Sequence, residues 1–163
     1  MPTAITAIIL LISYVIETAL LSSINFFGAA PNLVLVTIIC YSMVSGKEKG
    51  VVLGIFTGVV IDILSSSVFG VNILLYTFSA AIAGSLSNKI FGKNALTSVI
   101  IALIVSFVYG VIFSTAMYIL KIDTNIVYLM FAHFLPMCVY NAVISFFVYL
   151  LIENLYTISY RRS

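Results

Sequence analysis

The sequence has very few charged residues and no tryptophan. Its 163 residues include seven Lys or Arg and five Asp or Glu, which together make up only 7% of the chain. A water-soluble fold of this length needs more charged side chains than this to cover its surface. Because 63% of the residues are hydrophobic and the mean hydropathy is +1.28, the composition indicates a membrane protein. The formal net charge of +2 is too small to suggest nucleic acid as a partner.

Motifs for catalysis, metal binding and disulfide formation are also lacking. The two cysteines, Cys40 and Cys138, each lie inside an apolar run and form no C-x-x-C pair, so we expect reduced packing residues. The sequence contains no nucleophile elbow, phosphate loop or H-E-x-x-H motif. No pair of ionisable residues has the spacing of metal ligands. These absences predict a non-enzymatic protein without a metal or cofactor.

Hydrophobic runs separated by short polar segments predict an all-α membrane protein, a six-transmembrane-helix bundle that forms a single integral membrane domain over residues 1–163. The second run is short, about 20 Å long against a hydrocarbon core of about 30 Å. Pro136 is expected to kink the last helix. The expected helices cover about 4–22, 32–44, 50–64, a fourth that starts near 71, 95–120 and 125–152.

The basic residues predict the orientation of these helices. With six crossings, all but one of the basic loop and tail residues fall on the side of the N-terminus, and only Lys121 falls opposite. By the positive-inside rule, both termini are expected to be cytoplasmic in a bacterial cell membrane. The residues on the N-terminal side are Lys47, Lys49, Lys89, Lys93, Arg161 and Arg162.

Small residues recur every fourth position on two of the expected helices. We call Gly50, Gly54, Gly58 and Asp62 the glycine stripe, which ends in a carboxylate. Small residues at this spacing let a second helix approach closely, the usual mode of helix packing in lipid. A longer serine stripe on the fifth helix contains Ser98, Ala102, Ser106, Gly110 and Ser114.

These stripes are candidate contact faces for a partner helix, although each can equally pack against this chain's own helices. The partner-binding candidates are Gly50, Gly54, Gly58, Asp62, Ser106, Gly110 and Ser114.

Ionisable residues inside the expected membrane segments are a second candidate site. Rise per residue places Glu17, Asp62 and His133 in the outer half of the bilayer. If the helices bring them together, they form an outward-facing polar pocket to which Tyr76 and Asn141 also belong. Alternatively, each group is satisfied locally, Asp62 for instance by the serines of residues 65–67 or by the amide groups that open the next helix. His133 also begins a four-residue stripe with Met137, Asn141 and Ser145.

The third and fourth expected helices form a central hairpin, whose residue pattern resembles that of the MreD family, small membrane proteins of the bacterial rod-shape and lateral-wall system. The resemblance spans residues 31–162, although Ser79 and Ala80 stand where the family often has a Gly-Tyr pair. The matching residues are Pro31, Asn32, Leu33, the glycine stripe, Leu64, Gly70, Tyr76, Gly84, then Pro136 and Asn141 within LPMCVYNAVIS, and the basic tail.

This resemblance implies a non-enzymatic membrane scaffold of the peptidoglycan elongation machinery. Its partner would be MreC, a single-pass membrane protein, with the wall-building glycosyltransferase and transpeptidase and the MreB filament machinery reached indirectly. The family also looks like the substrate-binding subunits of energy-coupling-factor vitamin transporters, which share a six-helix architecture. The alternative function is therefore a small-molecule-binding transporter subunit that uses the polar pocket. An ion pathway would need further polar residues in the inner half, where only Asn141 and Ser145 lie.

Overall fold

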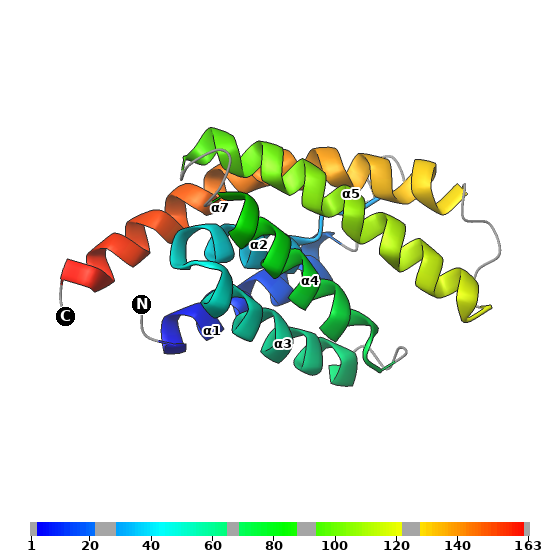
Figure 1. Cartoon of the computed structure of the whole chain (residues 1–163), viewed down its shortest axis with the longest axis horizontal. Helices are drawn as coiled ribbons and strands as arrows, with labels where there is room; N and C mark the ends of the chain where they lie inside the picture. Colours follow the sequence, from blue (N-terminus) through cyan, green and yellow to red (C-terminus); the bar gives the residue numbers. More distant parts are fainter. Residues whose placement is uncertain (1–2, 22–28, 65–68, 88–93, 122–127, 162–163) are drawn as a thin grey trace.

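The chain folds into helices arranged around one buried helix, as seen in a computed structural model (Figure 1) that describes residues 3–21, 29–64, 69–87, 94–121 and 128–161. The α-helical segment α1 continues directly into the π-helical segment η1, and the π-helical segment η3 continues into α7. The described residues therefore form the expected all-helical bundle. The elements are α1 (Thr3–Ile16), η1 (Glu17–Leu21), α2 (Leu33–Ser45), α3 (Lys47–Leu64), α4 (Val71–Leu86), α5 (Ala95–Ile119), η3 (Leu129–Phe134) and α7 (Leu135–Arg161).

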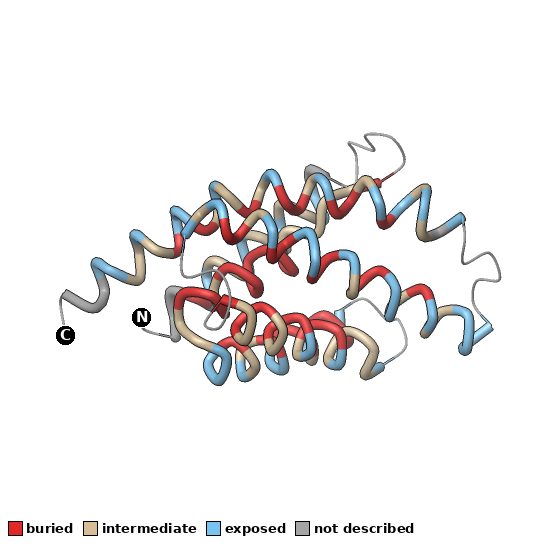
Figure 2. Tube along the Cα trace, turned by 45° about the horizontal axis from the view of Figure 1, so that its top comes forward, coloured by how far each residue is buried: buried red, intermediate tan, exposed pale blue. Residues whose placement is uncertain are grey.

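Helix α2 is the centre of the bundle. Its residues from Val34 to Val44 are buried except Tyr41, and it contacts α1, α3, α4, α5 and α7. Figure 2 shows this central segment as a nearly continuous buried stretch. A helix that is largely apolar on every face can be buried among other helices in this way. With 13 residues, α2 is about 20 Å long, which is shorter than the hydrocarbon core of about 30 Å in a typical bilayer.

Helices α3, α4, α5 and α7 form two pairs on opposite sides of α2, and α1 packs against α2 as well. Helices α3 and α4 make an antiparallel hairpin along one side, and α5 packs against α7 along the other (Figures 1 and 2). Helix α4 also contacts α5 and so joins the two pairs.

Two helix boundaries differ from those expected. Helix α3 begins at Lys47 and not near Gly50, because Gly46, with φ of 97°, makes the turn between α2 and α3 alone. The charged residues 47–49, expected in the turn before this helix, therefore form its first turn. Helix α7 continues to Arg161, beyond its expected end at Ile152. Several expected features lie outside the described residues. They are the end of the first helix at Ser22, the start of the last helix at Asn125, the serines of residues 65–67, and Lys89, Lys93 and Arg162.

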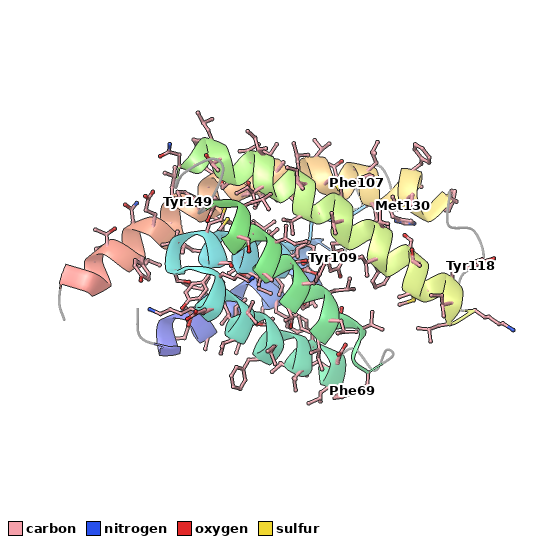
Figure 3. The ribbon with its side chains drawn as sticks, viewed as in Figure 1. Phe69, Phe107, Tyr109, Tyr118, Met130 and Tyr149 are labelled. Atoms are coloured by element: carbon pink, nitrogen blue, oxygen red, sulfur yellow. The ribbon has the colours of Figure 1, made fainter. Side chains whose placement is uncertain are left out.

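The outer surface of the bundle is apolar. Within the part of the chain that the structure describes, two segments, Ala95–Ile119 and Met130–Ile158, are long and apolar enough to cross a membrane, and Thr6–Ala19, Leu33–Ser45 and Val71–Leu86 are shorter apolar helices. Large side chains such as Phe56, Leu74 and Phe147 are exposed on this surface, and Figure 3 shows such side chains projecting around the bundle. Contiguous exposed apolar surface of this kind suits contact with lipid.

Candidate functional site

The glycine stripe lies between helices of this chain. A Cβ atom added at Gly54 would lie 2.8 Å from the carbonyl oxygen of Tyr76, and one added at Gly58 would lie 2.8 Å from the backbone nitrogen of Ile73. Both neighbours belong to α4, and Gly50 faces Ser42 of α2 in the same way. The absence of side chains thus brings the backbones of α3 and α4 into direct contact.

The serine stripe of α5 is also internal. Ser106 accepts a hydrogen bond from Asn141 of α7, and Ser98 donates one to the carbonyl oxygen of Ser145, at 3.2 Å. Gly110 leaves room for the ring of Phe134, whose Cγ would lie 2.8 Å from an added Cβ atom. Ser114 is buried too. A partner helix would have to displace α4, or η3 and α7, to reach either stripe, so direct partner contact there stays a prediction.

Asp62 joins the end of α3 to the start of α4. Its carboxylate accepts hydrogen bonds from the backbone N–H groups of Gly70, Asn72 and Ile73, at 2.8, 3.2 and 3.3 Å, and from the Asn72 side chain, at 2.9 Å. The first N–H groups of a helix have no partner within it and attract negative charge. Asp62 therefore has the second of its two expected local roles, binding to the amide groups that open the next helix.

Glu17 has a matching role at the start of the central helix α2. Its carboxylate accepts a hydrogen bond from the backbone N–H group of Val34, at 3.1 Å. The Asn32 side chain accepts the next donor, from Leu35 at 2.7 Å, and the Asn32 carbonyl accepts from Val36 at 3.1 Å. The otherwise unpaired donors of Val34 and Leu35 at this helix start are thus satisfied inside the protein.

Asn141 ties this helix start to α5 and α7. Its side-chain oxygen accepts from the Asn32 backbone N–H at 2.9 Å, and its amide nitrogen donates to Ser106 Oγ at 2.9 Å. On the α4 side, the ring of Tyr76 stacks on that of Tyr109, with 6.0 Å between ring centroids, and both side chains lie beside that of Asn32. We call Glu17, Asn32, Tyr76, Ser106, Tyr109 and Asn141 the polar cluster; Tyr109 marks its position near the middle of the bundle in Figure 3.

The Asn141 side chain of α7 bonds both to Asn32, at the start of α2, and to Ser106 of α5. Asn141→Leu is expected to lower the free energy of unfolding by about 2 kcal/mol, because the Asn32 N–H and the Ser106 hydroxyl lose their partner in a buried site. Chemical unfolding of the purified protein in detergent micelles, followed by circular dichroism, measures this loss. Asn154→Leu is the matched control, since Asn154 is exposed on the same helix. Equal stability of the two variants would contradict the linking role of Asn141.

His133 does not join the polar cluster. Its side chain is exposed and packs edge-on against Tyr128, with 6.1 Å between ring centroids, whereas Met137, Asn141 and Ser145 of its expected stripe are buried. His133 lies in the π-helical segment η3, where hydrogen bonds run from residue i to i+5 and four residues no longer complete a turn. The four-residue spacing assumed an unbroken α-helix, and η3 turns His133 off that face.

Of the residues expected to line a polar pocket, the structure brings Glu17, Tyr76 and Asn141 together. Asp62, near the end of α3, bonds to the start of α4, and His133 lies on the surface. Among the described residues, no group of three His, Cys, Asp or Glu side chains could hold a metal ion. A small, partly open space has a volume of about 10 Å³, no more than a single water needs. No member of the cluster lines it; its lining residues are Thr6, Ile9, Thr37, Tyr41, Leu53 and Ile152.

The spacing of residues could not reveal Asn32 and Tyr109 as members of the cluster. Asn32 carried a signal, because asparagine before an apolar helix is a favoured N-cap residue. Tyr109 carried none, since nothing in its neighbourhood distinguishes it from a tyrosine that faces lipid.

The comparisons with known proteins agree with the pattern of these residues. The profile of the family described as rod shape-determining protein MreD matches residues 1–158, essentially the whole chain. No curated protein and no solved structure gives a match. The buried glycine stripe, Asp62 and Asn141 lie within the matched region. The chain therefore belongs to the MreD family of rod shape-determining membrane proteins.

Proposed function

We propose that this protein is a non-enzymatic scaffold of the bacterial cell-shape and peptidoglycan elongation machinery. One observation carries the proposal: the side chains of Glu17, Asp62, Ser106 and Asn141 bond to this chain's own helices instead of facing a space for a substrate. The polar cluster connects η1, α2, α4, α5 and α7, and Asp62 connects α3 to α4. A satisfied buried network of this kind fixes one arrangement of helices, which is what a protein that positions partners requires.

We further propose that six helices cross the cell membrane, with both termini in the cytoplasm. Figure 1 shows both ends of the chain at the same end of the bundle. The exposed Lys47 and Lys49 lie at the start of α3, and Lys121 follows α5. An excess of basic residues at the end that carries both termini supports a cytoplasmic location for that end.

MreC is the proposed direct partner, and its single membrane helix is proposed to pack on the outer surface of α5 and α7. The exposed apolar residues of α5 extend from Leu96 to Leu120, about 36 Å along the helix. This length matches the roughly 20 apolar residues of an ordinary single-pass helix. The glycosyltransferase, the transpeptidase and the MreB filament machinery are reached indirectly through this contact.

Site-specific photo-cross-linking in bacterial cells tests the proposed contact. A photoreactive amino acid replaces Phe107 on α5, Phe147 on α7 or Phe56 on α3, all of which are exposed, and Tyr76, which is buried, is the control. We expect an adduct with MreC from Phe107 or Phe147 and none from Tyr76. Adducts from Phe56 alone would move the contact to α3, and the absence of adducts from every exposed position would contradict direct binding of MreC.

No observation favours the alternative, a small-molecule-binding transporter subunit. Asn32, Asn141 and Ser106 bond directly to one another, Glu17 bonds to the backbone of α2, and Asp62 and His133 lie outside the cluster. The transporter-like architecture therefore rests on the resemblance of the sequence alone.

A further inference from the structure

Helix α1 is the least buried helix of the bundle. Its main neighbour among the described elements is α2, whereas α2 itself contacts five helices. Between positions 6 and 19, Thr6 is the only buried residue. Most of the surface of α1 is therefore turned away from the protein. The exposed apolar side chains on that surface include Ile8, Leu11, Ile12 and Val15.

The hydroxyl contact between α1 and α2 can be broken without leaving an unpaired group. Ser13 Oγ of α1 lies 3.0 Å from Thr37 Oγ1 of α2. Each hydroxyl also has an acceptor in its own helix, the carbonyl oxygen of Ile9 for Ser13 and that of Leu33 for Thr37, both at 2.9 Å. When the two helices separate, both hydroxyls keep these bonds. The small, partly open space described above is lined by residues of both helices, so their packing is incomplete as well.

The bond from Val34 to Glu17 is different, because separation leaves both of its groups without a partner. The backbone N–H of Val34 lies in the first turn of α2 and has no acceptor within its own helix. It donates to the Glu17 carboxylate at 3.1 Å. Without Glu17 this N–H would be unpaired, and a carboxylate that leaves the protein at this depth would enter lipid, which is costly. Glu17 is therefore the contact that holds α1 on α2.

Lipid can replace protein on the face that α1 presents to α2. Lipid tails are as apolar as leucine, so no hydrophobic cost opposes the separation of two helices in a bilayer, and only packing and hydrogen bonds hold them together. We propose that α1 is a strap over α2, latched by Glu17, which opens toward lipid while the other helices stay packed. The proposal requires the membrane location stated under the proposed function, and it does not depend on MreC.

The strap also acts on the link between α2 and the pair of α5 and α7. The N–H groups of Asn32 and Val34 lie two residues apart; the first donates to Asn141, at 2.9 Å, and the second to Glu17. Asn141 in turn donates to Ser106 of α5. Opening of the strap removes one of the two side-chain acceptors from this short stretch of backbone. The position of α1 is thereby coupled to the arrangement of α5 and α7.

Thiol labelling of the full chain in phosphatidylcholine bilayers, without partners, tests this inference. Thr37→Cys places a thiol on the face of α2 that α1 covers, whereas the native Cys40 is buried against Ser145 of α7. The apolar reagent dithiodipyridine modifies a thiol only when it can reach it, and mass spectrometry reports each site separately. We expect labelling at position 37 to be at least about tenfold faster than at Cys40, because local opening exposes one site only. Equal rates at the two sites would overturn the inference, since α1 would then leave only when the whole bundle opens.

Changes at Glu17 test the latch in the same Thr37→Cys background. Glu17→Leu removes the acceptor and should raise the labelling rate at position 37 by about three- to tenfold, the range expected for loss of one hydrogen bond between membrane helices. The rate at Cys40 should stay unchanged. Glu17→Gln keeps one acceptor oxygen and should give an intermediate rate. The matched control is Val15→Leu, an exposed change on α1 that should have no effect.

Two results of these changes would contradict the latch. If Glu17→Leu raises the rate no more than Val15→Leu does, Glu17 does not hold the strap. If it raises the rates at position 37 and at Cys40 equally, Glu17 stabilises the whole bundle and there is no separate strap. Loss of the MreC cross-links would contradict the proposed function without changing these rates, because the bilayers contain no MreC.

Discussion

Gly58→Leu is expected to lower the free energy of unfolding by about 3 kcal/mol or more. The backbones of α3 and α4 meet at this position, and even a Cβ atom would come within 2.8 Å of the Ile73 nitrogen. Overpacking of a tight contact usually costs about 1 to 3 kcal/mol, and here the neighbour is backbone, which cannot move aside as a flexible side chain does. Unfolding in detergent micelles, followed by circular dichroism, gives the value.

Val60→Leu is the matched control for Gly58→Leu. Val60 is exposed on the same helix, so the larger side chain enters lipid or detergent and the stability should change by less than about 0.5 kcal/mol. If the two variants are equally stable, α4 does not pack on the glycine stripe. Loss of MreC binding by a stable Gly58→Leu variant would instead support the prediction that this stripe receives a partner helix.

Asp62→Ala is the second change with a large expected effect. The alanine removes the acceptor for the backbone N–H groups of Gly70, Asn72 and Ile73 and for the Asn72 side chain. Hydrogen bonds to a charged group contribute about 1.5 to 3 kcal/mol each when lost singly. Because the four share one carboxylate and are not additive, we expect a total loss of about 3 kcal/mol, measured by the same unfolding experiment.

Asp62→Asn separates the loss of hydrogen bonds from the loss of a side chain. Asparagine keeps one acceptor oxygen and the shape of aspartate, so it should recover about half of the stability lost by Asp62→Ala. An Asn variant as unstable as the Ala variant would show that the negative charge at the start of α4, and not the number of acceptors, stabilises the hairpin. Full stability of Asp62→Ala would contradict any capping role.

The sequence was sufficient to predict the elements and part of their contacts. Composition and hydrophobic runs predict the helices, and four-residue spacing predicts which faces of α3 and α5 make close contact. Spacing cannot tell which helix occupies such a face, because Gly54 offers the same groove to α4 and to a partner. The structure answers this for the described residues by placing Tyr76 and Ile73 against the stripe.

Long-range contacts and irregular turns limited the prediction of the polar cluster. The backbone N–H of Asn32 meets the Asn141 side chain across 109 residues, and no local pattern encodes that pairing. His133 was expected beside Asn141 because α-helical spacing was assumed through η3. A π-helical segment has no strong sequence signature, so its effect on the facing of His133 appears only in the structure.

Purification of the tagged full-length protein from bacterial membranes, with mass spectrometry of everything that remains bound, tests the scaffold function most directly. A scaffold with a filled interior should be recovered with MreC in stoichiometric amount and without a bound small molecule. Recovery of the protein alone, carrying a small molecule, would contradict the scaffold function and favour the transporter-like alternative. Glu17, Asp62 and His133 would then be the first residues to replace.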